Sequence, residues 1–152
     1  MGYDAFMEIT QLTKESESAL EDINKLLIQL SGDSSNNRGS LSDLRQVVNN
    51  QNVVMIVAKD GDRIVGMGFL YLITHVGRRS GHVEDVVVDK DYRGQGLGER
   101  IMKDLIGAAR KNKLETIYLT SKPERLAANH LYQKLGFVRK ETNVYKLPLE
   151  NK

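Results

Sequence analysis

A glycine-rich stretch, Arg93-Gly94-Gln95-Gly96-Leu97-Gly98, is the clearest chemical feature of the sequence. It stands directly before apolar residues at helical spacing, so its backbone N–H groups can converge on an anion such as a pyrophosphate at a helix N-terminus. Glycine suits such a loop because a side chain would block the phosphate oxygens and because inward-pointing N–H groups often require positive φ. The Arg93 side chain can add charge-assisted hydrogen bonds. A strand-to-helix turn with a purely structural use is the alternative.

The spacing of the glycines argues against one class of nucleotide site. Gly94, Gly96 and Gly98 follow the order G-x-G-x-G, whereas the fingerprint of a Rossmann dinucleotide site is G-x-G-x-x-G. A nicotinamide cofactor is therefore disfavoured.

Side chains that can transfer protons lie on both sides of the loop. Glu84 and Asp85 interrupt a β-branched run, and since successive strand residues face opposite sides, both can reach one place only if a bulge intervenes. We expect at most one of them to be a direct base, and a solvated or salt-bridged residue is the alternative for either. Asn129 and Tyr132 lie three residues apart on a predicted helix, so both can face one side. A single strand histidine such as His82 is more often structural, and we leave it outside the catalytic set.

Composition restricts the class of protein. With 152 residues, 40% of them hydrophobic, the chain is predicted to form one domain, 1–152. It has no cysteine, and its three histidines lack the spacing of a zinc motif, so we expect no disulfide and no metal. A net charge of +2 does not indicate nucleic-acid binding. No run approaches the ~20 apolar residues of a membrane span, so we expect no membrane partner and a cytoplasmic location.

The elements that must position these groups follow one another without an internal repeat. Apolar periodicity, caps and turn residues predict the following order: an edge strand at 6–12, a helix at 19–30, a shorter helix from Ser40, hairpin strands at 53–58 and 64–72, a mobile connection at 77–81, a central strand at 83–88, a helix from Leu97, a strand at 116–120, a helix from a capping box at 121–124 to Gly136, and a closing hairpin of 137–139 and 144–147. The glycine-rich loop therefore connects the acidic strand to a helix.

The loop matches the signature of the GNAT superfamily of N-acetyltransferases, in which Gln or Arg is followed by two residues, Gly, one residue, and Gly or Ala. Upstream, Val86-Val87-Val88 is similar to the strand on which that superfamily lays pantetheine, and residues 129–137 are similar to its last motif. The resemblance implies an α/β (α+β) fold with a mixed, mainly antiparallel sheet flanked by helices. Strands four and five would splay apart to receive CoA. It further implies an acyltransferase that uses acetyl-CoA as co-substrate.

The resemblance also implies roles for individual residues. The CoA-binding set is Val86, Val87, Val88, Arg93, Gly94, Gln95, Gly96, Leu97, Gly98 and Asn129. For Asn129, a polar residue on the helix surface is the alternative. Tyr132 matches the tyrosine that faces the CoA sulfur as a general acid, with a core tyrosine as the alternative. The chemistry of direct amine attack, rather than the resemblance, requires a base that deprotonates the amine. Glu84 is favoured over Asp85 for this role, and a water chain without a dominant base is the third choice. A strand backbone N–H could stabilise the oxyanion.

The acceptor is less defined than the donor. Residues 81–88 resemble glucosamine-6-phosphate N-acetyltransferases, in which case Arg78 and Arg79 could meet a sugar phosphate. Thr120-Ser121, however, stands where that family has an acidic residue. We therefore favour an unidentified small-molecule or peptide amine. A CoA-binding sensor without enzymatic activity is the non-enzyme alternative, and a homodimer is left open.

Overall fold

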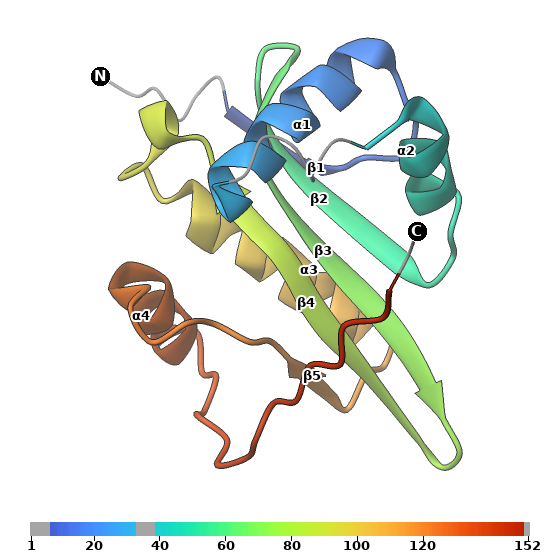
Figure 1. The fold of residues 1–152 in the computed structure, drawn as a ribbon, viewed down its shortest axis with the longest axis vertical. Helices are drawn as coiled ribbons and strands as arrows, with labels where there is room; N and C mark the ends of the chain where they lie inside the picture. The colour runs from blue at the N-terminus through green and yellow to red at the C-terminus, as the bar shows by residue number, and fades with distance from the viewer. Residues whose placement is uncertain (1–6, 33–38, 151–152) are drawn as a thin grey trace. The chain divides into compact units, whose positions relative to one another are not determined.

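A five-stranded sheet with the order β1-β2-β3-β4-β5 forms the centre of the first of two compact units, which ends at Thr120 (Figure 1). The structure is a computed structural model that describes residues 7–32 and 39–150. The strands are β1 (Met7–Gln11), β2 (Val53–Asp60), β3 (Arg63–His75), β4 (Arg78–Val88) and β5 (Thr116–Tyr118). Strands β1 to β4 pair antiparallel, and β4 pairs with β5 in parallel. The mixed, mainly antiparallel sheet expected from the sequence is confirmed.

Helices cover both faces of this sheet (Figure 1). In the described part of the first unit they are α1 (Glu17–Ser31), α2 (Leu41–Val48) and α3 (Leu97–Lys111). Ile23 of α1 and Leu44 of α2 share a hydrophobic core with inward-facing strand residues such as Val57 of β2. On the opposite face, Ile101 and Leu105 of α3 approach the glycines of β3. Burial of these apolar side chains on both faces supplies the main driving force for the arrangement.

Side-chain caps define where the first two helices begin. The Ser16 hydroxyl accepts a hydrogen bond from the Ala19 N–H at 3.1 Å. At α2, Ser40 and Asp43 form a reciprocal capping box, at the helix start that the sequence predicts. The hydrogen bonds from Ser40 hold the pKa of the Asp43 carboxyl below its ordinary value of 3.8. Both caps satisfy N–H groups that the helices themselves leave unpaired.

The predicted mobile connection at 77–81 is wrong, because β4 already begins at Arg78. His75 pairs with Arg78, so the turn consists of Val76 and Gly77 alone. Gly77, the second residue of the turn, has a φ of +82°, as a type II turn requires at that position, and glycine adopts it at no steric cost. His75 Nε2 also lies 2.7 Å from the Ser80 hydroxyl, which joins the two strands beside the turn.

The second unit runs from Ser121 and contains the helix α4 (Leu126–Lys134). The predicted capping box at 121–124 is wrong, since α4 begins after Arg125 and has no side-chain cap. Instead, the Arg125 N–H donates to the Lys122 carbonyl at 3.1 Å, which closes a turn with Pro123 at its second position. Proline presets φ for that position, and the turn delays the helix.

The C-terminus of α4 has the stop that Gly136 predicts. The Gly136 N–H donates to the Gln133 carbonyl and the Phe137 N–H to the Tyr132 carbonyl, each at 3.0 Å. With Gly136 at φ +100°, this is a Schellman motif. The Tyr132 and Phe137 rings meet edge to face with centroids 6.0 Å apart. This contact closes the motif and holds the Tyr132 ring at the end of the helix.

The predicted closing hairpin at 137–139 and 144–147 is wrong, because neither segment is a strand. The side chains of Val138, Val144 and Leu147 are exposed. A two-stranded hairpin is at best marginally stable unless its apolar face is covered. The alternation of apolar residues was therefore insufficient to predict strands here.

Candidate active site

Strand β4 has a β-bulge at its two carboxylates. Val87 pairs with Met67 and Glu84 pairs with Phe69, so β4 has one more residue than β3 over this interval. Asp85 accommodates the extra residue with a φ of +49°. Aspartate adopts this left-handed conformation more readily than most residues, which explains why the bulge can occur here without a glycine.

The bulge brings both carboxylates to the same region of the sheet. Phe69 belongs to the core beneath α1 and α2, so its partner Glu84 faces that side. Tyr71, two residues further along β3, also packs against that core. Burial raises the pKa of the Tyr71 phenol above its ordinary value of 10.0, and the charges of Asp85 and then Glu84 raise it further. The simple alternation that would separate the two carboxylates is therefore interrupted.

Asp85 lies at the surface but in a partly desolvated position. Its side chain is exposed to solvent overall. The protein around it nevertheless removes part of the water from its carboxyl group, and this desolvation raises the pKa of the carboxyl above the ordinary value of 3.8. A carboxylate with a raised pKa is a stronger base than an ordinary surface aspartate, so Asp85 has the chemistry required to accept a proton from an amine.

One edge of β4 is open where the CoA arm is expected to bind. Strand β5 pairs only with residues 80–82 of β4. Beyond them, Val86, Val87 and Val88 have no β5 partner within the described part of the first unit. The Val88 carbonyl already accepts a hydrogen bond from Arg93. The other backbone groups that point away from β3 can bond a ligand that contains amides, as in the addition of a strand.

The glycine-rich loop leaves its backbone accessible. Gly94 and Gly96 have φ values of +81° and +78°, and a Cβ atom at either would meet nothing within 4 Å. Backbone conformation, not packing, therefore accounts for glycine at these two positions. Gly96 is also the N-cap of α3 and offers no side chain to the first turn. The N–H groups of Leu97 and Gly98 consequently have no cap at the end of the helix that attracts anions.

Two further contacts shape this loop. The Arg93 Nε donates to the Val88 carbonyl at 3.0 Å, which ties the loop to the end of β4. The Gln95 Oε1 atom is buried and has no hydrogen-bond partner among the described residues. Burying such an oxygen unpaired costs free energy, so a donor supplied by a ligand would relieve the cost. The loop as a whole fits the pyrophosphate end of CoA.

Tyr132 and Asn129 lie in the second unit. Burial raises the pKa of the Tyr132 phenol above its ordinary value of 10.0, partly offset by the charge of Arg125. The phenol is thus protonated at neutral pH and can donate a proton. The Asn129 Nδ2 donates to the Lys122 carbonyl at 2.9 Å, so one end of its amide already holds the turn before α4. The predicted catalytic role of Tyr132 and CoA contact of Asn129 stay predictions.

Sequence reasoning missed Tyr71 and Tyr118. Tyr71 pairs with His82, which in turn pairs with Tyr118, so the three rings lie in one row across β3, β4 and β5. The centroids of the His82 and Tyr118 rings are 5.6 Å apart. The period-two pattern of each strand could have placed these rings on a face, but only the strand register places them in one row.

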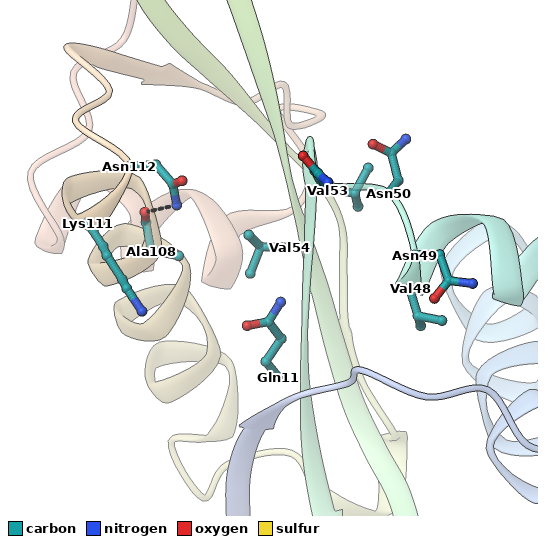
Figure 2. Close-up of a pocket in the computed structure, with 10 residues that line it drawn as sticks. Gln11, Val48, Asn49, Asn50, Val53, Val54, Ala108, Lys111 and Asn112 are labelled. Atoms are coloured by element: carbon teal, nitrogen blue, oxygen red, sulfur yellow. Dashed lines mark hydrogen bonds between the residues drawn. The ribbon is translucent and has the colours of Figure 1, made fainter.

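A hollow of about 350 Å³ lies elsewhere in the first unit (Figure 2). Its lining includes Gln11, Asn49, Val54 and Asn112, and it contains none of the predicted site residues. The Asn112 amide is engaged with the Ala108 carbonyl at 2.8 Å and ends α3 (Figure 2). This hollow is separate from the candidate active site.

Within residues 7–32 and 39–150, no helix is long and apolar enough to cross a membrane. The same part of the chain contains no group of three or more His, Cys, Asp or Glu side chains able to hold a metal ion. The cytoplasmic location stays a prediction from the sequence.

The model of the acetyltransferase (GNAT) family matches residues 18–137, which includes β4, the glycine-rich loop and α4. The chain belongs to the GNAT family. Acetyl-CoA is the donor that this family uses, and the predicted acyltransferase class is confirmed. An open strand edge and an uncapped helix N-terminus have the chemistry to bind such a donor. The individual CoA-binding residues stay predictions.

The chain is similar to GNAT enzymes that are named for different acceptors. It is 42% identical over 78 residues to a glucosamine 6-phosphate N-acetyltransferase of Trypanosoma brucei brucei, covering 49% of this chain and 51% of the relative. It is 34% identical over 67 residues to a ribosomal protein bS18-alanine N-acetyltransferase of Escherichia coli, covering 44% and 45%. The chain thus matches about half the length of these curated relatives.

A solved structure extends the similarity over nearly the whole chain. An acetyltransferase from Trypanosoma brucei superimposes with a TM-score of 0.75 at 31% sequence identity, covering 94% of this chain and 99% of that one. The fold of the GNAT family is therefore confirmed.

Proposed function

We propose that the chain transfers the acetyl group of acetyl-CoA to a primary amine of a small molecule or peptide by direct attack. The observation that supports it best is the order of features along the chain from β4 to α3. A bulged, acidic segment of β4 is followed by the open edge at residues 86–88, a short 3-10 helix (Lys90–Tyr92), and the glycine-rich loop at the uncapped N-terminus of α3. In this proposal the loop binds the pyrophosphate and the edge of β4 binds the pantetheine arm. The acetyl thioester then lies beside the two carboxylates.

In the proposed step, one side chain accepts a proton from the amine and another donates a proton to the leaving group. The neutral amine nitrogen attacks the thioester carbonyl carbon, and the C–S bond breaks as the amide forms. Glu84 or Asp85 takes the proton that the amine loses. Tyr132 gives its phenolic proton to the departing thiolate. The raised pKa of the Asp85 carboxyl supports a place for it beside Glu84 as a base.

Glucosamine 6-phosphate is the second candidate acceptor, because 42% identity to a glucosamine 6-phosphate N-acetyltransferase favours it. The arginines proposed for its phosphate do not support this choice. Alternation places Arg78 and Arg79 on opposite faces of β4. Arg78 shares the face of Glu84 but lies on the order of 20 Å along the strand from it. A sugar phosphate with its amine at Glu84 would need another phosphate-binding group.

An assay of thiol release from acetyl-CoA with a panel of amines tests the proposal. The panel should contain peptides with free N-termini, a polyamine, glucosamine and glucosamine 6-phosphate. We expect thiol release that depends on one class of amine. Binding of acetyl-CoA without transfer to any amine would instead support the CoA-binding sensor.

A further inference from the structure

Tyr71 lies on β3 at a position diagonal to Glu84. Tyr71 pairs with His82 and Phe69 pairs with Glu84, so these four residues occupy adjacent positions on one face of the sheet. Diagonal neighbours on antiparallel strands are within reach of long side chains. The phenol of Tyr71 and the carboxylate of Glu84 can therefore meet at one ligand.

The Tyr71 ring is held firmly while its hydroxyl is available. The ring stacks on Phe69 with centroids 6.2 Å apart and packs against the core beneath α1. Its hydroxyl is hydrogen-bonded to none of the residues that the structure describes. A fixed ring that presents an unengaged hydroxyl is well suited to orient a small group, because little side-chain entropy remains to be lost.

The charges around the Tyr71 phenol indicate what kind of group its hydroxyl orients. The negative charges of Asp85 and Glu84 both act on the Tyr71 phenol and raise its pKa after burial has done so. The phenol thus stays protonated and neutral at physiological pH, able both to donate and to accept a hydrogen bond. The two negative charges beside this neutral phenol favour the binding of a positively charged group at Tyr71.

We propose that Tyr71 binds the acceptor as a primary ammonium ion, with its oxygen accepting one N–H bond and its O–H donating to a carboxylate of the bulge. One carboxylate of the bulge takes the first proton and leaves the neutral amine that attacks, and the other carboxylate takes the second proton as the amide forms. The row of Tyr71, His82 and Tyr118 rings forms the adjacent wall of this acceptor site. The inference rests on the proposed acetyltransferase function and adds an acceptor-binding residue to it. The preferred acceptors are amines that are positively charged at neutral pH and carry no phosphate next to the amine.

Steady-state kinetics of Tyr71→Phe test this inference. The substitution removes one oxygen and keeps the stacked ring, so the thermal midpoint should stay close to that of the wild type. The KM for the acceptor amine should rise about tenfold or more, because a hydrogen bond to a charged group is lost. The KM for acetyl-CoA should not change. Tyr145→Phe, which removes the same oxygen from an exposed ring, is the matched control and should leave both KM values unchanged.

A double variant separates binding from general damage. If Tyr71 and Asp85 hold the same ammonium group, the acceptor KM of Tyr71→Phe combined with Asp85→Asn should rise less than the product of the single effects. An unchanged acceptor KM in Tyr71→Phe, or a fall in kcat alone, would overturn the acceptor-binding role. Failure of the wild type to acetylate any amine would instead reject the proposed function itself.

Discussion

Val86 occupies the space that a side chain at Gly68 would need. A Cβ atom on Gly68 would lie 3.3 Å from the Val86 Cγ2, 2.9 Å from the Ile101 Cγ2 and 3.0 Å from the Leu105 Cδ1. Gly68 stands opposite the bulge, between the residues that pair with Glu84 and Val87. The missing side chain lets β4 bulge and lets α3 lie close against the sheet.

Gly68→Ala should therefore destabilise the protein by about 1–3 kcal/mol, the usual cost of overpacking a core. The Ile101 Cγ2 belongs to a β-branched side chain, which cannot easily change rotamer within a helix. Chemical denaturation would measure the loss. Gly107→Ala on α3 is the control, since a Cβ there meets nothing within 4 Å. It should be neutral or stabilising by roughly 1 kcal/mol. Equal stability of the two variants would contradict the packing argument.

Asp85→Asn should stabilise the protein at neutral pH and not in acid. The folded protein raises the pKa of this carboxyl above 3.8, so ionisation is less favourable in the folded state than in the unfolded chain. Below the unfolded pKa both states are protonated and no penalty applies. As pH rises through the folded pKa the penalty develops fully. Asparagine removes it while still tolerating positive φ.

The gain at pH 7 should be less than about 1 kcal/mol, because solvent screens an exposed carboxylate. Thermal midpoints of the variant and the wild type, measured at pH 7 and near pH 3, would show whether the gap closes in acid. Asp104→Asn, at an exposed position on α3, serves as the control. A gap that widens as pH falls would refute the assigned direction of the pKa.

Tyr132→Phe should lower kcat by roughly 10²-fold while acetyl-CoA affinity changes little, if the phenol protonates the departing thiolate. The ring contact with Phe137 should persist, because it involves no hydroxyl. Single-turnover measurement with acetyl-CoA already bound would exclude product release from the observed rate. Single-turnover rates like those of the wild type across the pH profile would mean that Tyr132 only packs.

Local patterns predicted those features that depend on neighbouring residues. The helix start at Ser40, the glycine loop before α3 and the stop at Gly136 each need only a few consecutive residues, and the structure contains all three. The bulge at Asp85 could not be predicted in this way. It depends on Gly68, which lies on another strand, and on the side chains of α3 above it.

The pairing of β3 with β4 also explains why the sequence does not predict the role proposed for Tyr71. Nothing in the residues around Tyr71 marks it as part of a site, and its relation to Glu84 follows only from the register of β3 and β4. The error at 121–124 had a different cause. Residues 121–124 match the pattern of a capping box. In the structure, however, Pro123 lies in a turn that the Arg125 N–H closes, and α4 begins after this turn.

Titration calorimetry of acetyl-CoA on matched glycine variants measures whether the glycine-rich loop binds the pyrophosphate. Gly96 and Gly61 both have positive φ, +78° and +60°, and open space at the Cβ position, so Gly96→Ala and Gly61→Ala introduce similar backbone strain. Only Gly96 lies in the loop proposed to hold the pyrophosphate. Gly96→Ala should weaken acetyl-CoA binding about tenfold or more, whereas Gly61→Ala should bind like the wild type. If a folded Gly96→Ala protein bound acetyl-CoA as tightly as the wild type, the glycine-rich loop would not be the pyrophosphate site.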